Sequence, residues 1–156
     1  MQHLGSSPSV ILIVDDDEGH VELILQNLAE CSPGSRIEHF STGTAVLDFL
    51  YGRGPGPIGE SGRRYVVLLD VRMPMVDGVE VLRQIKAEPR LRSMVVIMLS
   101  TSDGLEEMAR CHELGCNFYV TKPVDAGLFS RAICQIGKFI DVLQLPESEG
   151  MAFAEI

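Results

Sequence analysis

The chain has 156 residues, of which 46% are hydrophobic and 22% charged, as in one globular domain with its own core. A formal net charge of -9 disfavours a nucleic-acid partner, because an acidic surface repels phosphate. The absence of Trp also disfavours a platform for base stacking. No secretion signal begins the sequence and no apolar run approaches the about 20 residues of a membrane span, so we expect a cytoplasmic protein without membrane contact.

Short apolar runs alternate with helical patterns along the sequence. Strands are expected at 10–14, 37–40, 66–69, 95–99 and 118–120. Apolar residues recur at helical spacing near 21–28, 46–50, 78–85, 103–114 and 126–145. The expected helix N-caps are Asp17, Thr42 and Asp125. Five strand–helix units predict an α/β fold, with a parallel sheet covered by helices on both faces and right-handed crossovers.

The domain is expected to fill most of the chain. We place a flexible N-terminus at 1–9, the folded domain at 10–145 and an acidic C-terminal tail at 146–156. The segment 52–64, GRGPGPIGESGRR, predicts an irregular loop. Because a strand follows this loop, it should lie at the end of the sheet opposite the carboxyl ends of the strands, as a tolerated insertion or a partner contact.

Polar residues stand where the apolar strands end. Asp15 and Asp16 follow the first strand, Asp70 the third, Ser100 the fourth and Lys122 the fifth. Because ligands of open parallel sheets bind outside the carboxyl ends of the strands, we expect these five side chains to meet in one cleft.

The chemistry of this set indicates a cation and a phosphoryl group. Two like charges about 4 Å apart repel by about 4 kcal/mol at a surface-like dielectric, so three carboxylates must take up a proton or a cation. Oxygen ligands alone favour Mg²⁺, which commonly shares a phosphate oxygen. Lys122 and Ser100 could then bind that anion, while one carboxylate serves as the nucleophile.

Four cysteines, Cys31, Cys111, Cys116 and Cys134, show neither Cys-x-x-Cys spacing nor the density of a disulfide scaffold. We therefore expect reduced, mostly buried thiols. His112 and Cys116 lie four positions apart, as two metal ligands on a helix would, but nothing nearby completes a four-ligand site.

Four motifs carry a resemblance to a known family. They are ILIVDDD at 11–17, VVLLDVRMPMVDG at 66–78, VIMLSTS at 96–102 and YVTKP at 119–123. In this order they resemble the receiver domains of response regulators. The resemblance implies a flavodoxin-like (βα)5 fold, doubly wound, with strand order 2-1-3-4-5. It also implies a single-domain response regulator of a two-component system, which takes a phosphoryl group from a sensor histidine kinase.

The resemblance assigns roles to the residues at the strand ends. Asp70 matches the phosphoacceptor, and Asp15 and Asp16 match the acidic pair that helps to hold Mg²⁺. The backbone carbonyl of Arg72 would be a further metal ligand. Lys122 matches the lysine that pairs with the phosphoryl group.

The resemblance also implies a conformational switch. Ser100 matches the switch hydroxyl, with Ser in place of the commoner Thr, and Tyr119 matches the aromatic switch residue that moves with it. Lys122–Pro123 matches the usual cis peptide bond. Arg72 and Ser102 stand at variable positions that tune the lifetime of the acyl phosphate.

The expected last helix, 126–145, is apolar around most of its circumference. Since one apolar face suffices to cover a sheet, the excess predicts a two-fold homodimer through this helix. Few residues follow it, so we expect output through binding. The segments VDDDEGHVELILQNL at 14–28 and FIDVLQLP at 139–146 resemble stand-alone regulators that serve bacteriophytochromes.

Other functions compete with this interpretation. A phosphorelay intermediate, which passes its phosphoryl group to a histidine phosphotransfer protein, has the same sequence signature. A haloacid-dehalogenase-type hydrolase would need a second Asp where Arg72 stands, and a nucleotide-binding domain would need a glycine-rich phosphate loop after the first strand. We therefore expect a signalling receiver that catalyses only its own phosphorylation and autodephosphorylation.

Overall fold

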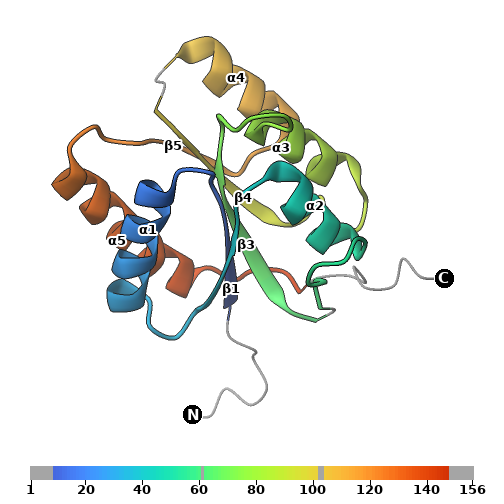
Figure 1. The fold of residues 1–156 in the computed structure, drawn as a ribbon, viewed down its shortest axis with the longest axis horizontal. Coiled ribbons are helices and arrows are strands. Elements are labelled where there is room, and N and C mark those ends of the chain that lie inside the picture. Colours follow the sequence, from blue (N-terminus) through green and yellow to red (C-terminus); the bar gives the residue numbers. More distant parts are fainter. Residues whose placement is uncertain (1–8, 61, 102–103, 148–156) are drawn as a thin grey trace.

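A computed structural model describes residues 9–60, 62–101 and 104–147, in which five strands alternate with five helices (Figure 1). The strands are β1 (Ser9–Val14), β2 (Arg36–Phe40), β3 (Arg64–Asp70), β4 (Val95–Ser100) and β5 (Phe118–Thr121). The helices are α1 (Glu18–Cys31), α2 (Gly43–Tyr51), α3 (Gly78–Ala87), α4 (Leu105–Leu114) and α5 (Ala126–Val142).

All five strands are parallel and form one sheet in the order β2-β1-β3-β4-β5. The predicted fold class and strand order are therefore confirmed. Central strands β1 and β3 are almost continuously apolar, because helices cover both of their faces. Figure 1 shows α1 and α5 on one side of the sheet and α2, α3 and α4 on the other.

Successive residues of the strands enter two different cores. Leu12 and Leu69 pack toward α2 and α3, whereas Ile11 and Leu68 pack toward α1 and α5. Each of these four side chains is fully buried. Packing on both faces fixes the carboxyl ends of β1 and β3, and therefore the residues that follow them.

The expected N-caps are confirmed. The carboxylate of Asp17 accepts from the amide of His20, and that of Asp125 accepts from the amide of Leu128. The hydroxyl of Thr42 accepts from the amide of Ala45 in the same way. Each contact satisfies one amide that lacks a partner within its own helix.

Helix α5 ends at Val142 rather than near 145, so the predicted end of this helix is wrong. Leu145 instead lies in the core with 2% exposure, and its carbonyl accepts from the guanidinium of Arg64 at 2.8 Å. Pro146 also disfavours helical geometry in the residue before it. The start of the expected tail is tied to β3, because Arg64 also pairs with Glu147.

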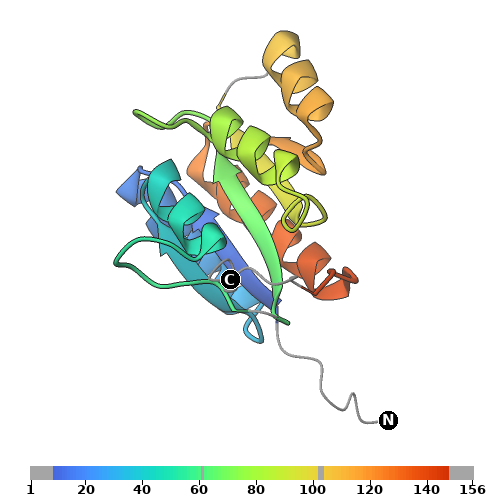
Figure 2. The ribbon, with the colours of Figure 1, turned by 90° about the vertical axis from the view of Figure 1, so that its right-hand side faces the viewer.

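The loop between α2 and β3 lies at the amino end of β3, away from Asp70, as expected. Figure 2 shows β3 running from this loop toward the side of the molecule that carries α4. Ser9, placed in the flexible N-terminus by the sequence, instead belongs to β1 and is aligned with Arg64. Within the described residues, no helix combines the length and the apolar character that crossing a membrane requires.

Two of the four cysteines are joined, so the prediction of reduced thiols is wrong for them. Cys31 at the end of α1 forms a disulfide with Cys134 in α5, with their Cα atoms 5.3 Å apart. Packing of α1 on α5 brings together two residues that lie 103 positions apart in sequence. Cys111 and Cys116 are free and buried, as expected.

Candidate functional site

Three carboxylates converge at the carboxyl edge of the sheet. Asp15 and Asp16 follow β1, Asp70 ends β3, and one oxygen from each lies within 4.8 Å of the others. Asp15 and Asp70 are buried, whereas Asp16 is exposed. Among the described residues this is the one acidic, His or Cys group whose spacing suits a metal ion. The predicted meeting of the acidic trio is confirmed.

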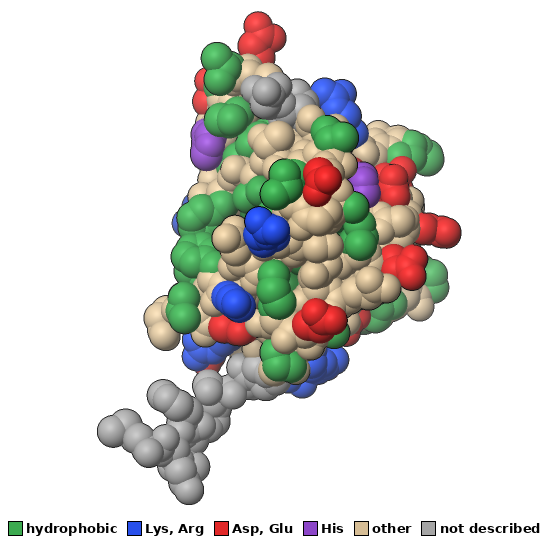
Figure 3. Space-filling model, turned by 90° about the vertical axis from the view of Figure 1, so that its left-hand side faces the viewer, with side chains coloured by type: hydrophobic (Ala, Val, Ile, Leu, Met, Phe, Trp, Pro, Cys, Tyr) green, Lys and Arg blue, Asp and Glu red, His purple; other side chains and the backbone are tan. Residues whose placement is uncertain are grey.

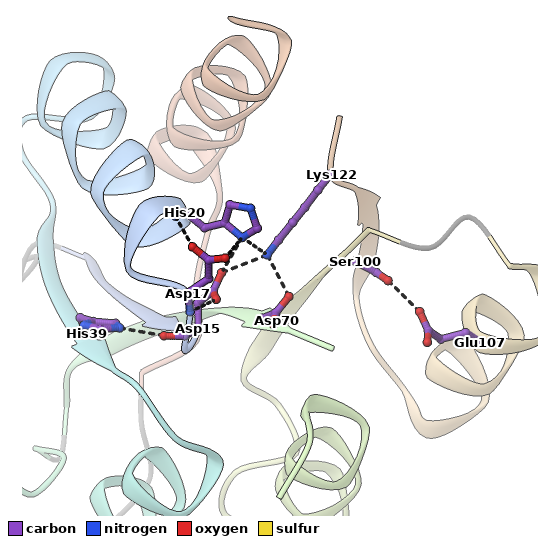
Figure 4. A network of polar contacts seen from close by, with 8 residues as sticks. All are labelled: Asp15, Asp17, His20, His39, Asp70, Ser100, Glu107 and Lys122. Atoms are coloured by element: carbon purple, nitrogen blue, oxygen red, sulfur yellow. Dashed lines mark hydrogen bonds and ion pairs between the residues drawn. The ribbon is translucent and has the colours of Figure 1, made fainter. Parts of the chain in front are cut away.

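Lys122 joins two members of this acidic cluster. Its ammonium donates to Asp70 Oδ1 at 2.8 Å and to Asp15 Oδ2 at 3.0 Å, as Figure 4 shows. The Lys122 side chain is only 3% exposed. Its backbone amide donates to the carbonyl of Ser100 at 2.6 Å, which ties the end of β5 to the end of β4. The lysine is therefore held from both its backbone and its head group.

Burial and the opposite charge of the ion-pair partner shift the pKa values of Asp70 and Lys122 in opposite directions. Burial raises the pKa of Asp70, and it prevails over Lys122, which favours the carboxylate. Asp15 and Asp16 raise the pKa of Asp70 further through like-charge repulsion. Burial alone would lower the pKa of Lys122, but the two adjacent carboxylates reverse this and raise it. Lys122 is therefore a permanent cation at neutral pH.

Gly78 and the helix N-cap residue Asp77 hold Asp70 in position. A Cβ on Gly78 would lie 2.1 Å from the carbonyl oxygen of Asp70, so the start of α3 can approach β3 only without a side chain. Asp77 caps α3 by accepting from the amide of Glu80. The amide of Val71 donates to the carbonyl of Leu99 on β4. The backbone on either side of Asp70 is thus fixed.

His20 belongs to the site although the sequence interpretation passed over it. Its Nδ1 lies 3.3 Å from the Lys122 ammonium and 3.8 Å from an oxygen of Asp15, and its side chain is 37% exposed. The ring also packs against Phe129 of α5, with centroids 5.6 Å apart. The position three residues after the cap Asp17 is the only sequence signal that directs it toward the cluster.

Ser100 ends β4 and is buried, but its hydroxyl turns away from Asp70 (Figure 4). Its hydroxyl donates to Glu107 Oε1 of α4 at 2.7 Å, and Figure 4 shows this pair separated from the Asp70–Lys122 contact. Tyr119 on β5 donates to the same oxygen at 2.8 Å. Sequence interpretation missed Glu107, because an acidic residue in the first turn of a helix is already explained by the helix dipole.

Arg72 contributes a charged side chain to the same contact. Its guanidinium donates to Glu107 Oε2 at 3.2 Å, and its side chain is 67% exposed. The expected cation beside the acidic cluster is therefore paired with α4. Ser102, the second residue expected to tune acyl-phosphate lifetime, lies outside the described residues.

The Lys122–Pro123 bond is trans, since the described part of the chain contains no cis peptide bond. The expected cis bond is therefore wrong. A trans X–Pro bond is favoured by about 0.5–1 kcal/mol, and with it the Lys122 ammonium still reaches both carboxylates.

The chemistry of the donor set fits a hard divalent cation. Three carboxylates offer oxygen ligands of the kind that Mg²⁺ prefers, and Lys122 neutralises only part of their charge. Asp16 is exposed, so the cluster opens to solvent on one side. His112 and Cys116 contact each other at 3.7 Å, and no third His, Cys, Asp or Glu ligand joins them among the described residues.

Several known proteins are similar to this chain in sequence and in fold. A family model of the response regulator receiver domain matches residues 11–133. A probable methanogenesis regulatory protein, FilR2 of Methanothrix harundinacea, is 37% identical over 138 residues, which are 86% of this chain and 85% of that protein. A response regulator receiver domain from Rhodospirillum rubrum is 38% identical with a TM-score of 0.83, covering 90% of this chain and 99% of that one. The bacteriophytochrome response regulator AtBRR is 36% identical with a TM-score of 0.65, covering 88% and 99%.

Proposed function

Because the chain belongs to the response regulator receiver family of two-component systems, we propose that Asp70 accepts a phosphoryl group from a sensor histidine kinase and so controls binding to a partner. The observation that carries the proposal is the contact of Lys122 with Asp70 and Asp15 beside Asp16. A nucleophilic carboxylate, a fixed cation and a metal-ligand set lie within one site.

The transfer is a displacement at phosphorus. An oxygen of Asp70 attacks the phosphohistidine, the P–N bond breaks as the P–O bond forms, and the kinase imidazole keeps the electron pair and takes a proton. Asp15, Asp16, Asp70 and the carbonyl of Arg72 would hold Mg²⁺, which when bound would neutralise charge on the transferring oxygens.

The other residues of the site respond to the new anion. Lys122 exchanges part of its contact with Asp70 for a phosphoryl oxygen. Ser100 turns from Glu107 to donate to the phosphoryl group. Tyr119 then moves with Ser100, toward the space that the Ser100 side chain has left. Phosphorylation adds about two negative charges, and the loops after β4 and β5 transmit their effect to α4 and α5. The chain acts as a receiver that catalyses only its own phosphorylation and dephosphorylation.

Labelling by a small phosphodonor tests the assignment of Asp70. The wild-type chain should gain one phosphoryl group from acetyl phosphate in the presence of Mg²⁺, and intact-mass spectrometry would detect it. Asp70→Asn should abolish the gain, whereas Asp48→Asn, which lies in α2 outside the site, should label normally. Full labelling of Asp70→Asn would place the acceptor elsewhere.

A kinase of the bacteriophytochrome class is the proposed phosphodonor. The support is likeness to the bacteriophytochrome response regulator AtBRR, together with the resemblance of segments 14–28 and 139–146 to regulators that serve bacteriophytochromes. Kinase and receiver would meet in the cytoplasm. A panel of phosphorylated histidine kinases would test this, and faster transfer from kinases of another class would refute it.

The outer surface of α5 supports a proposed homodimer. Leu128, Phe139 and Val142 are 51%, 42% and 72% exposed, and Phe139 makes an edge-to-face contact with Phe118 of β5. Figure 3 shows hydrophobic side chains on the side of the molecule where α1 and α5 lie, interspersed with single charges. A second copy of α5 would cover this surface. Light scattering should give twice the chain mass, and Phe139→Glu should give a monomer; a monomeric wild type at tens of micromolar would exclude the dimer.

A further inference from the structure

Glu107 of α4 gathers three side chains that surround the phosphorylation site. Its Oε1 accepts from Ser100 at 2.7 Å and from Tyr119 at 2.8 Å, and its Oε2 accepts from Arg72 at 3.2 Å. Its side chain is 19% exposed, so solvent competes little for these bonds. One carboxylate thus connects α4 to the ends of β3 and β4 and to β5.

The donors can remain in place at neutral pH. Burial and the contact with Glu107 raise the pKa of Tyr119 to about 12, although a hydrogen bond with Ser100 acts in the opposite direction. The phenol therefore keeps its proton and donates a hydrogen bond to the carboxylate. Hydrogen bonds to a charged group are stronger than those between neutral groups, about 1.5–3 kcal/mol against about 1 kcal/mol.

Ser100 faces two alternative acceptors. A hydroxyl carries a single proton, so Ser100 can donate either to Glu107 or to a phosphoryl group on Asp70. The contact with Glu107 therefore has to break before the switch hydroxyl can serve the phosphorylated state. Any free energy that stabilises the resting contact is subtracted from the free energy of phosphoryl binding.

Helix α4 is able to move when that contact breaks. Cys111 is its only fully buried residue, whereas α3 buries Gly78, Val81, Leu82 and Ile85. Leu105 at its start is 79% exposed. A helix with so little buried apolar surface is held mainly by polar contacts, and losing them shifts it at low cost.

We propose that Glu107 is a resting-state latch: it holds Ser100 and Tyr119 away from Asp70 and is released when the phosphoryl group accepts the hydrogen bond of the Ser100 hydroxyl in its place. The inference rests on the proposed function of Asp70 and adds a positioning residue that opposes it. The latch sets how far the unphosphorylated chain populates the active arrangement, and through α4 it couples the site to the surface of that helix.

Binding of beryllofluoride, a phosphoryl analogue, tests the latch in the full chain with Mg²⁺. Glu107→Ala should lower the apparent Kd by about fivefold or more, the lower end of typical coupling between two states. Glu107→Gln keeps an acceptor without the charge and should give a smaller gain; it also serves if the alanine variant does not fold. Glu106→Ala is the matched control, because Glu106 is an exposed neighbour and its substitution removes the same charge from the same helical turn.

A double-mutant cycle separates a latch from simple charge repulsion. In a Ser100→Ala background, the gain from Glu107→Ala should shrink, because one of the bonds that it releases is already absent. An undiminished gain there, an equal gain from Glu106→Ala, or no gain from either Glu107 variant would overturn the latch. Failure of the proposed function is distinct: wild type would then neither bind beryllofluoride nor become phosphorylated.

Discussion

Replacing Lys122 by Met removes the cation that lies between the buried carboxylates of Asp15 and Asp70. Oxygens of Asp15, Asp16 and Asp70 lie within 4.8 Å of one another, so each like-charged pair repels by about 3.5 kcal/mol or more at an effective dielectric of about 20. Breaking a buried ion pair on one side typically costs about 3–5 kcal/mol. We expect the Lys122→Met variant to lose about that much free energy of unfolding at pH 7 without divalent cations.

The pH dependence follows from the raised pKa of Asp70. Burial raises that pKa and Lys122 opposes the rise, so removing Lys122 raises the pKa further. For such a group the penalty of ionisation is absent below the unfolded pKa of about 3.9 and complete above the folded pKa. The gap between the variant and wild type should therefore be small near pH 4 and full at neutral pH.

Urea denaturation in EDTA at both pH values measures this gap, and Lys138→Met on the exposed face of α5 is the matched control. The control should change stability by less than about 0.5 kcal/mol. Added Mg²⁺ should stabilise the Lys122→Met variant more than wild type, because its carboxylates lack their internal counter-ion. A loss below about 1 kcal/mol at pH 7, or an equal loss at pH 4, would refute the electrostatic reasoning.

Two further predictions concern the backbone and the disulfide. Gly78→Ala places a Cβ 2.1 Å from the carbonyl oxygen of Asp70, so we expect a loss of about 3 kcal/mol or more in urea denaturation, and an unimpaired variant would contradict the close approach. Gly34→Ala, where a Cβ meets nothing within 4 Å, is the control and should be nearly neutral. Reducing the Cys31–Cys134 disulfide opens a loop of about a hundred residues and should lower the free energy of unfolding by about 2–5 kcal/mol. Dithiothreitol should have no effect on Cys31→Ser, and an equal effect on that variant would show that the bond is not the cause.

The sequence predicted the acidic site because its geometry follows from local pattern and chirality. Apolar runs identify the strands, and a helix between each pair of strands makes them parallel, which places all carboxyl ends at one edge. Asp70 and Lys122, 52 positions apart, then have to approach each other, and their contact at 2.8 Å agrees with that expectation. N-caps were predictable for a similar reason, since they depend on residues within one helical turn.

Features that depend on how one helix lies against another were not predictable. The disulfide requires Cys31 and Cys134 to face each other across α1 and α5, and no periodicity encodes the rotation of two helices about their axes. The end of α5 at Val142 is accompanied by a contact from β3, because the guanidinium of Arg64 donates to the carbonyl of Leu145. In each case the deciding partner belongs to an element remote in sequence.

Glu107 belongs to α4, outside the strand ends that carry the reactive groups, and its contacts can control how those groups respond to phosphorylation. The acidic cluster and Lys122 provide the reactivity, and their positions are fixed by strands packed on both faces. Ser100 stands on the same rigid strand edge, but its partner lies on a helix with little buried surface. A rigid acceptor site coupled to a weakly held helix can turn a new local charge into movement, because the helix yields before the sheet does. The strength of the Glu107 contacts, more than the reactivity of Asp70, would then decide how much phosphorylation changes the surface that a partner meets.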